Sequence, residues 1–129
     1  MTERYGKQGA RRILIVDDDP DLVDRIAQLL EDDYEVLSTT DWGEINKLFF
    51  REGVDLVLMD VQLPVLGGDR LVGVLRAART QGKRTPIVYF SSSDEEKMQR
   101  LVDETGADGY LSKSLRGAEI VRAIERYLS

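Results

Sequence analysis

The stretch ILIVDDDP, residues 13–20, joins a run of aliphatic side chains to three consecutive aspartates and a proline. A continuous aliphatic and β-branched run is typical of a strand that is buried on both faces of a parallel sheet. Asp19 followed by Pro20 is a common helix start, because aspartate caps free backbone N–H groups and proline fits the first turn. The stretch therefore predicts a buried strand, a short acidic loop and a helix.

The rest of the chain repeats this alternation of strand and helix. Further strands are predicted at residues 34–38, 54–61, 87–90 and 110–112. Apolar residues recur at helical spacing in five segments, which contain Leu22, Ile45, Leu71, Met98 and Ile120. Short connections between alternating strands and helices predict a parallel sheet with helices on both faces.

Two of the predicted helices begin with a capping box, in which a short polar residue is followed three positions later by glutamate. The two pairs are Asp41 with Glu44 and Ser93 with Glu96. Gly53 and Gly106 follow the apolar pattern of the second and fourth helices, where glycine is a common terminator. The last helix is expected to run from about Leu115 to the end of the chain.

Composition narrows the possible functions. The chain has 129 residues, of which 42% are hydrophobic and 33% charged, as expected for one globular domain. It contains no histidine and no cysteine, which excludes a Ser-His-Asp triad, thiolate catalysis, disulfides and imidazole-bound zinc. The lack of cysteine fits a reducing compartment, and we expect a cytoplasmic protein.

The charge and the ends of the chain set further limits. Lys and Arg number 18 against 24 Asp and Glu, a net charge of −6, which is unfavourable for binding a phosphate backbone. No apolar run approaches the roughly 20 residues of a membrane span. We therefore expect no nucleic-acid binding by this domain and no membrane insertion. Residues 1–10 are polar and are predicted to form a flexible N-terminal leader.

Polar side chains follow the predicted strands at the points where they end. Asp17 and Asp18 follow the first strand, Asp60 ends the third, Ser91 ends the fourth, and Lys113 follows the fifth. Ligands of parallel sheets bind beyond the carboxyl ends of the strands. Three carboxylates in one place repel each other, and a hard divalent cation such as Mg²⁺ relieves the repulsion. A cation and a lysine beside a carboxylate suit phosphoryl transfer.

Each of these residues also has a simpler interpretation. Asp19 is explained as a helix cap, Ser91 could be an ordinary strand-end serine, and Lys113 could be an exposed surface lysine. Asp60 is harder to explain in this way, because it lies in an apolar strand where an unpaired charge is costly.

Four motifs together resemble the receiver domain of two-component response regulators. They are ILIVDDDP at 13–20, DLVLMDVQLPVLGG at 55–68, PIVYFSS at 86–92 and GADGYLSK at 106–113. Their order and spacing are specific to that family, and the resemblance covers about residues 11–128. It implies an α/β, flavodoxin-like, doubly wound five-stranded parallel sheet of order 2-1-3-4-5 with five helices. Residues 11–129 would form the receiver domain.

The resemblance also implies a role for each matching residue. Asp60 would be the phosphoacceptor, and Lys113 would contact the phosphoryl group. Mg²⁺ would be held by Asp17, Asp18, Asp60 and the backbone carbonyl of Gln62. Ser91 and Tyr110 would be the switch residues. The chain departs from the family at Ser114, where a proline usually follows the lysine.

A receiver is a switch with weak self-phosphorylation and autodephosphorylation activity, and we do not expect a metabolic enzyme. The implied phosphodonor is a histidine kinase or a histidine phosphotransfer protein. Phosphorylation would change the surface of the fourth helix, fifth strand and last helix, and so control an output protein. A phosphorylation-dependent homodimer through that surface is a further expectation.

Two alternatives remain from the sequence. One is a receiver-fold binding module that is not phosphorylated in the cell. The other is a phosphatase similar to haloacid dehalogenases, in which Asp17 would be the nucleophile and Asp19 the general acid. The second alternative leaves Asp60 without a role.

Overall fold

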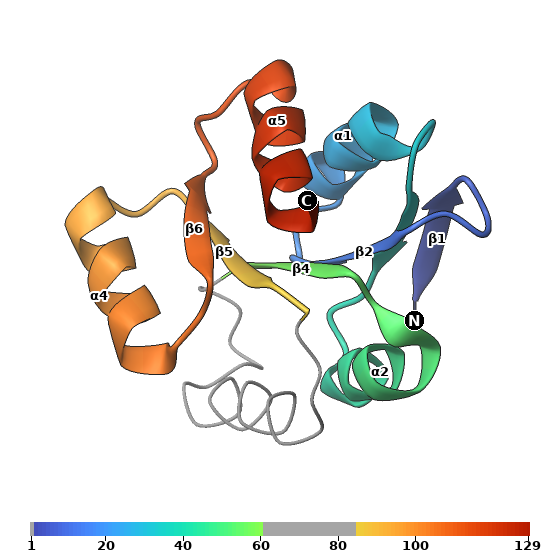
Figure 1. Cartoon of the computed structure of the whole chain (residues 1–129), viewed down its shortest axis with the longest axis horizontal. Coiled ribbons are helices and arrows are strands. Elements are labelled where there is room, and N and C mark those ends of the chain that lie inside the picture. Colours follow the sequence, from blue (N-terminus) through green and yellow to red (C-terminus); the bar gives the residue numbers. More distant parts are fainter. Residues whose placement is uncertain (1, 61–84) are drawn as a thin grey trace.

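The structure is a computed structural model, which describes residues 2–60 and 85–129 (Figure 1). Its centre is a six-stranded sheet in the order β1-β3-β2-β4-β5-β6. The strands are β1 Glu3–Gly6, β2 Arg12–Val16, β3 Glu35–Ser38, β4 Leu56–Asp60, β5 Ile87–Ser91 and β6 Gly109–Ser112. The helices are α1 Pro20–Leu30, α2 Trp42–Lys47, α4 Glu95–Thr105 and α5 Gly117–Leu128, and α2 continues as a π-helix over Leu48–Gly53.

Five strands of the sheet have the predicted topology. β2 pairs in parallel with β3 and β4, β4 with β5, and β5 with β6. Numbered from the first parallel strand, this is the order 2-1-3-4-5, so the doubly wound, flavodoxin-like arrangement is confirmed. The predicted third helix and Gln62 lie outside the described residues.

The N-terminal residues differ from the prediction. Residues 3–6, expected within a flexible leader, form β1, which pairs antiparallel with β3 and makes the sheet six-stranded. Arg4 holds this strand in place through Glu35 at 3.2 Å and Glu52 at 2.9 Å. Because β1 covers the edge of β3, all four residues of β3 are buried.

The helix boundaries follow from capping. The Asp19 side chain accepts hydrogen bonds from the N–H groups of Asp21 and Leu22, as predicted. The predicted start of α4 at Ser93 is wrong, because Asp94 is the cap residue and accepts from the Lys97 N–H at 2.9 Å. Gly106 ends α4 with a φ of 78°, a left-handed conformation that glycine adopts without strain.

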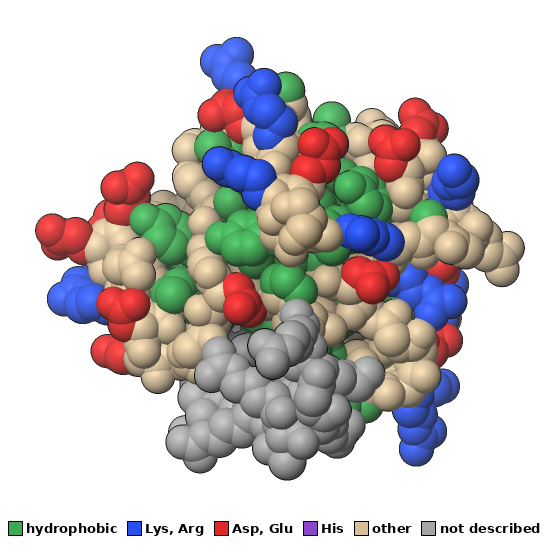
Figure 2. Space-filling view, in the orientation of Figure 1, with side chains coloured by type: hydrophobic (Ala, Val, Ile, Leu, Met, Phe, Trp, Pro, Cys, Tyr) green, Lys and Arg blue, Asp and Glu red, His purple; other side chains and the backbone are tan. Residues whose placement is uncertain are grey.

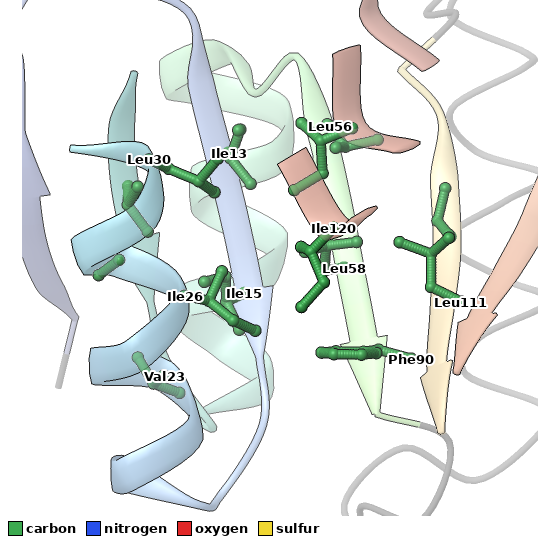
Figure 3. Packing of buried hydrophobic residues seen from close by; sticks show 14 of the residues in the cluster. Ile13, Ile15, Val23, Ile26, Leu30, Leu56, Leu58, Phe90, Leu111 and Ile120 are labelled. Carbon is green, nitrogen blue, oxygen red and sulfur yellow. The ribbon is translucent and has the colours of Figure 1, made fainter. Parts of the chain in front are cut away.

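Successive residues of a strand point to opposite faces, so the sheet separates two apolar layers. On one face, α1 and α5 pack on the strands, with Ile26, Leu30 and Ile120 near Ile13 and Leu58 (Figure 3). The residues of the other layer come from the strands, α2, the π-helix and α4, and they include Leu14, Val57, Ile45, Phe49 and Met98. The central strands are thereby buried between the two apolar layers.

No helix within residues 2–60 and 85–129 combines the length and apolar character needed to cross a membrane.

Candidate functional site

Three aspartates meet at the carboxyl ends of β2 and β4. The two strands are parallel neighbours, with Val16 beside Met59, so the residues that follow them in sequence are adjacent in space. One carboxylate oxygen from each of Asp17, Asp18 and Asp60 lies within 4.8 Å of the others. Asp17 is 4% exposed and Asp60 6% exposed, whereas Asp18 is open to solvent. The predicted convergence of these carboxylates is therefore observed.

Lys113 reaches the same place from the end of β6. Its Nζ lies 3.0 Å from Asp17 Oδ2 and 3.5 Å from Asp60 Oδ2. Its aliphatic chain brings the ammonium to 6.0 Å from the centre of the Phe90 ring, on the strand between. Partial burial by itself lowers the pKa of Lys113, but the contacts with Asp17 and Asp60 outweigh it and raise that pKa above its usual value.

The donor set suits a hard cation. Asp17 Oδ1 accepts a hydrogen bond from the Asp19 N–H at 3.0 Å. Its buried Oδ2 is paired with the Lys113 ammonium at 3.0 Å. Among the residues that the structure describes, one ammonium faces three carboxylates, and like charges held this close repel each other. Mg²⁺ prefers carboxylate oxygens and keeps part of its water shell, so these residues fit it.

The two predicted switch residues lie on neighbouring strands. Ser91 ends β5, is 1% exposed, and accepts a hydrogen bond from the Ser93 N–H at 3.0 Å. Tyr110 lies in β6 beside Tyr89 and is partly buried against the apolar layer that contains α4. Ser91 lies one residue beyond the level of Asp60 in the sheet, since Phe90, the residue before Ser91, pairs with Asp60.

A cavity of about 270 Å³ beside the acidic pair includes residues that the sequence did not single out. Besides Asp17 and Asp18, its lining includes Glu3, Ser38 and Thr39. Glu3 reaches this edge because the antiparallel β1 places it opposite Ser38, at the carboxyl end of β3. No local signal could have identified Glu3, because residues 3–6 show neither apolar alternation nor a turn motif at their start.

Comparison with known proteins agrees with this geometry. The family model for the response regulator receiver domain matches residues 13–125. The alkaline phosphatase synthesis transcriptional regulatory protein PhoP of Bacillus subtilis is 35% identical over 120 residues, which are 90% of this chain and 49% of that protein. The CAI-1 autoinducer sensor kinase/phosphatase CqsS of Vibrio cholerae is 34% identical over 104 residues, 80% of this chain and 15% of that protein. The chain thus spans half or less of these relatives.

A solved structure gives the same result. The chemotaxis protein CheY4 of Vibrio cholerae superposes with a TM-score of 0.76 at 26% identity, over 93% of this chain and 100% of that one. The fold, the order of the strands and the acidic edge all agree with the matched family, whose members are signalling switches. The chain belongs to the response regulator receiver domain family of two-component systems.

Proposed function

We propose that this receiver accepts a phosphoryl group on Asp60 from the phosphohistidine of a histidine kinase or histidine phosphotransfer protein. The observation that carries the proposal is the meeting of three carboxylates with the Lys113 ammonium, which lies 3.0 Å from Asp17 and 3.5 Å from Asp60. Asp17, Asp18 and Asp60 would hold Mg²⁺, with the backbone carbonyl of Gln62 as a further ligand.

In the transfer, a carboxylate oxygen of Asp60 attacks phosphorus, and the bond between phosphorus and the donor imidazole nitrogen breaks. The bonding electrons return to the imidazole, which leaves as a neutral or protonated ring. The Lys113 ammonium remains beside the Asp60 carboxylate and neutralises charge on the phosphoryl oxygens. Bound Mg²⁺ supplies further positive charge to those oxygens and to the crowded carboxylates. The burial of Asp60 limits the access of water, which favours slow hydrolysis of the acyl phosphate.

The switch follows from the new charge on Asp60. The Ser91 hydroxyl turns toward a phosphoryl oxygen, because a hydrogen bond to a dianion is stronger than one to a neutral group. Its movement opens space for Tyr110 to turn inward, and the surface of α4, β6 and α5 shifts to its active form. The partial burial of Tyr110 supports this role, since it leaves the ring room to become more buried.

We propose that an output protein binds this surface. A second copy of this chain, in a phosphorylation-dependent homodimer, is another partner that the surface could bind. Among the described residues, acidic and basic side chains are interspersed on the face drawn in Figure 2. This distribution suits a protein partner better than nucleic acid.

The phosphatase alternative is less well supported. It requires Asp19 as a general acid near the reacting group. The Asp19 carboxylate instead caps α1, where it accepts from Asp21 at 3.1 Å and Leu22 at 3.4 Å. A side chain held in this way points along the helix start and has a structural role.

The proposal is tested by intact mass after incubation with acetyl phosphate and Mg²⁺. We expect one added phosphoryl group in the wild type, none in Asp60→Asn, and none without the metal. Asp55→Asn is the matched control, because Asp55 lies just before the other end of β4 and binds the Arg12 N–H. Labelling on Asp17 would establish the phosphatase chemistry. If the protein takes up no phosphoryl group and also shows no metal-dependent binding of beryllofluoride, the remaining function is that of a binding module that is not phosphorylated.

A further inference from the structure

Lys113 lies between two serines that are bonded to each other. Ser112 Oγ accepts a hydrogen bond from the Ser114 N–H at 3.1 Å, and the two hydroxyl oxygens lie 2.7 Å apart in a second hydrogen bond. Both bonds span Lys113 and close a small ring around its backbone. The residue that carries the ammonium is thus held from both sides by side chains of its immediate neighbours.

Backbone hydrogen bonds complete this turn. The Lys113 N–H donates to the Ser91 carbonyl at 2.9 Å, which ties the turn to the end of β5. The Leu115 N–H donates to the Ser112 carbonyl at 3.2 Å. These backbone bonds fix the position of the Lys113 backbone. The hydrogen bonds between Ser112 and Ser114 restrict the backbone torsion angles of Lys113, because they join the residues on either side of it.

The location of the pair indicates what it is for. Ser114 is exposed and Ser112 partly exposed, so their hydrogen bonds compete with water and add little to global stability. A lysine side chain has several free torsions, so the place that its ammonium reaches depends on the backbone from which it starts.

We infer that Ser112 and Ser114 are positioning residues that aim the Lys113 ammonium at Asp17 and Asp60. This inference rests on the proposed function, because the aimed ammonium is the group that neutralises the phosphoryl oxygens. The serine pair sets the rate of phosphoryl transfer through Lys113 and leaves metal binding to the aspartates. Ser112 is the more important of the two, since its oxygen takes part in both bonds.

The first test measures the initial rate of phosphoryl incorporation from acetyl phosphate at saturating Mg²⁺. We expect Ser112→Ala to be about fivefold slower and Ser114→Ala about twofold slower, which matches the net effect of one or two exposed hydrogen bonds. Ser112→Thr keeps the hydroxyl and restores the rate. Ser129→Ala is the matched control, because it removes a hydroxyl bonded to the Arg126 carbonyl at the far end of α5.

A double-mutant cycle separates positioning from a general loss of structure. If the serine pair acts through Lys113, Ser112→Ala causes no further loss of rate in a Lys113→Ala background. The Mg²⁺ dissociation constant, measured by calorimetry, stays within about twofold of wild type, and the melting temperature is unchanged. An equal loss in both backgrounds, or a weakened metal affinity, would overturn the inference.

A second readout does not depend on phosphorylation. The chain has five lysines, so the side-chain nitrogen signals of ¹⁵N-lysine protein can be assigned by substitution. The ion-paired Lys113 ammonium should give a visible, slowly exchanging signal in wild type and Ser112→Thr, and a broadened one in Ser112→Ala. An unchanged signal in Ser112→Ala refutes positioning. A wild type that takes up no phosphoryl group refutes the proposed function, while this signal still decides the role of the serines.

Discussion

The two ends of the sheet each carry a cluster of charged side chains, and the clusters differ in their balance. The cluster at the amino ends of the parallel strands, here the amino-end cluster, consists of Arg4, Arg12, Glu35 and Glu52. Arg4 contacts both glutamates, and Arg12 contacts Glu35 at 3.0 Å and the Glu52 carbonyl. Two guanidinium groups thus face two carboxylates, and the buried Glu35 has both as partners.

The carboxyl-end cluster consists of Asp17, Asp18, Asp60 and Lys113. Within residues 2–60 and 85–129, one ammonium here faces three carboxylates, two of which are buried. Of its supporting strands, only β2 also carries a residue of the amino-end cluster, whose other members come from β1, β3 and the π-helix. Among the described residues, the two clusters differ in the balance of their charges.

This difference teaches how a structural charge cluster can be told from a functional one. In the amino-end cluster each glutamate is paired with at least one arginine side chain, so the cluster stabilises β1 and the fold. At the carboxyl end, the part of the chain that the structure describes places three carboxylates beside one ammonium, so a bound cation would relieve their repulsion and add stability. The four predictions that follow test this contrast by changing the charge at one end at a time.

The largest effect is expected from metal. Mg²⁺ at about 100 times its dissociation constant should raise the free energy of unfolding by about 2.7 kcal/mol, since it binds the folded state. Urea unfolding with and without Mg²⁺ measures this change. Asp18→Asn should lose most of it and Glu52→Gln should keep it. Equal stabilisation of all three proteins would show that the cation acts elsewhere.

Breaking the amino-end cluster should have the next largest effect. Glu35→Gln leaves Arg4 and Arg12 without their buried carboxylate and should lower the free energy of unfolding by about 2 kcal/mol. The loss stays below that of a fully buried pair, because both arginines are a third or more exposed. The exposed Glu104→Gln serves as control, and phosphorylation should be unaffected. If Glu35→Gln lowers the free energy of unfolding no more than Glu104→Gln does, the amino-end cluster does not stabilise the fold.

Neutralising a carboxylate at the other end should have a smaller effect of opposite sign. In metal-free protein, Asp18→Asn should raise the free energy of unfolding by about 0.5 kcal/mol, because it relieves repulsion between like charges near the surface. The same urea titration detects it. If Asp18→Asn destabilises the metal-free protein as Glu35→Gln does, the two clusters do not differ in the way described.

The smallest effect concerns alkaline pH. Contacts with Asp17 and Asp60 raise the pKa of Lys113 in the folded protein, so its pairing stabilises the fold below the usual lysine pKa of 10.5. That contribution is lost as pH rises through the raised value. The stability difference between wild type and Lys113→Met, without metal, should therefore be constant from neutral pH to about pH 10 and shrink above it. Both proteins share the same tyrosines, whose titration cancels in the difference. A difference that grows above pH 10 would contradict the pairing.

Much of the site followed from the sequence because its elements are local. Each aspartate stands directly after or at the end of an apolar run, and parallel strands bring such positions to one edge. The same reasoning could not find Asp94 as the cap of α4, because Ser93 and Asp94 are both good cap residues and Ser93 instead donates its N–H to Ser91. A choice between adjacent caps depends on the contacts of the loop before the helix.

β1 shows most clearly what local pattern cannot supply. Glu3–Gly6 has no apolar alternation, and its place in the sheet depends on Arg4 reaching Glu35 and Glu52, which are 31 and 48 residues away in sequence. The burial of Glu35 has the same origin. A strand that is stabilised by partners so distant leaves no periodic signal in its own residues.

The sequence by itself determined the alternating strands and helices, the parallel pairing of the strands, and the carboxylates at the strand ends, because apolar periodicity and strand direction are properties of short segments. Only the tertiary structure decided that β1 closes the sheet, that Glu35 is balanced by two arginines, and that Lys113 touches Asp17 and Asp60 from a turn held by Ser112 and Ser114. The physical reason is that the charged side chains at each end of the sheet come from segments that are far apart in sequence. They contact one another only in the folded chain, so no short segment shows their balance of charge.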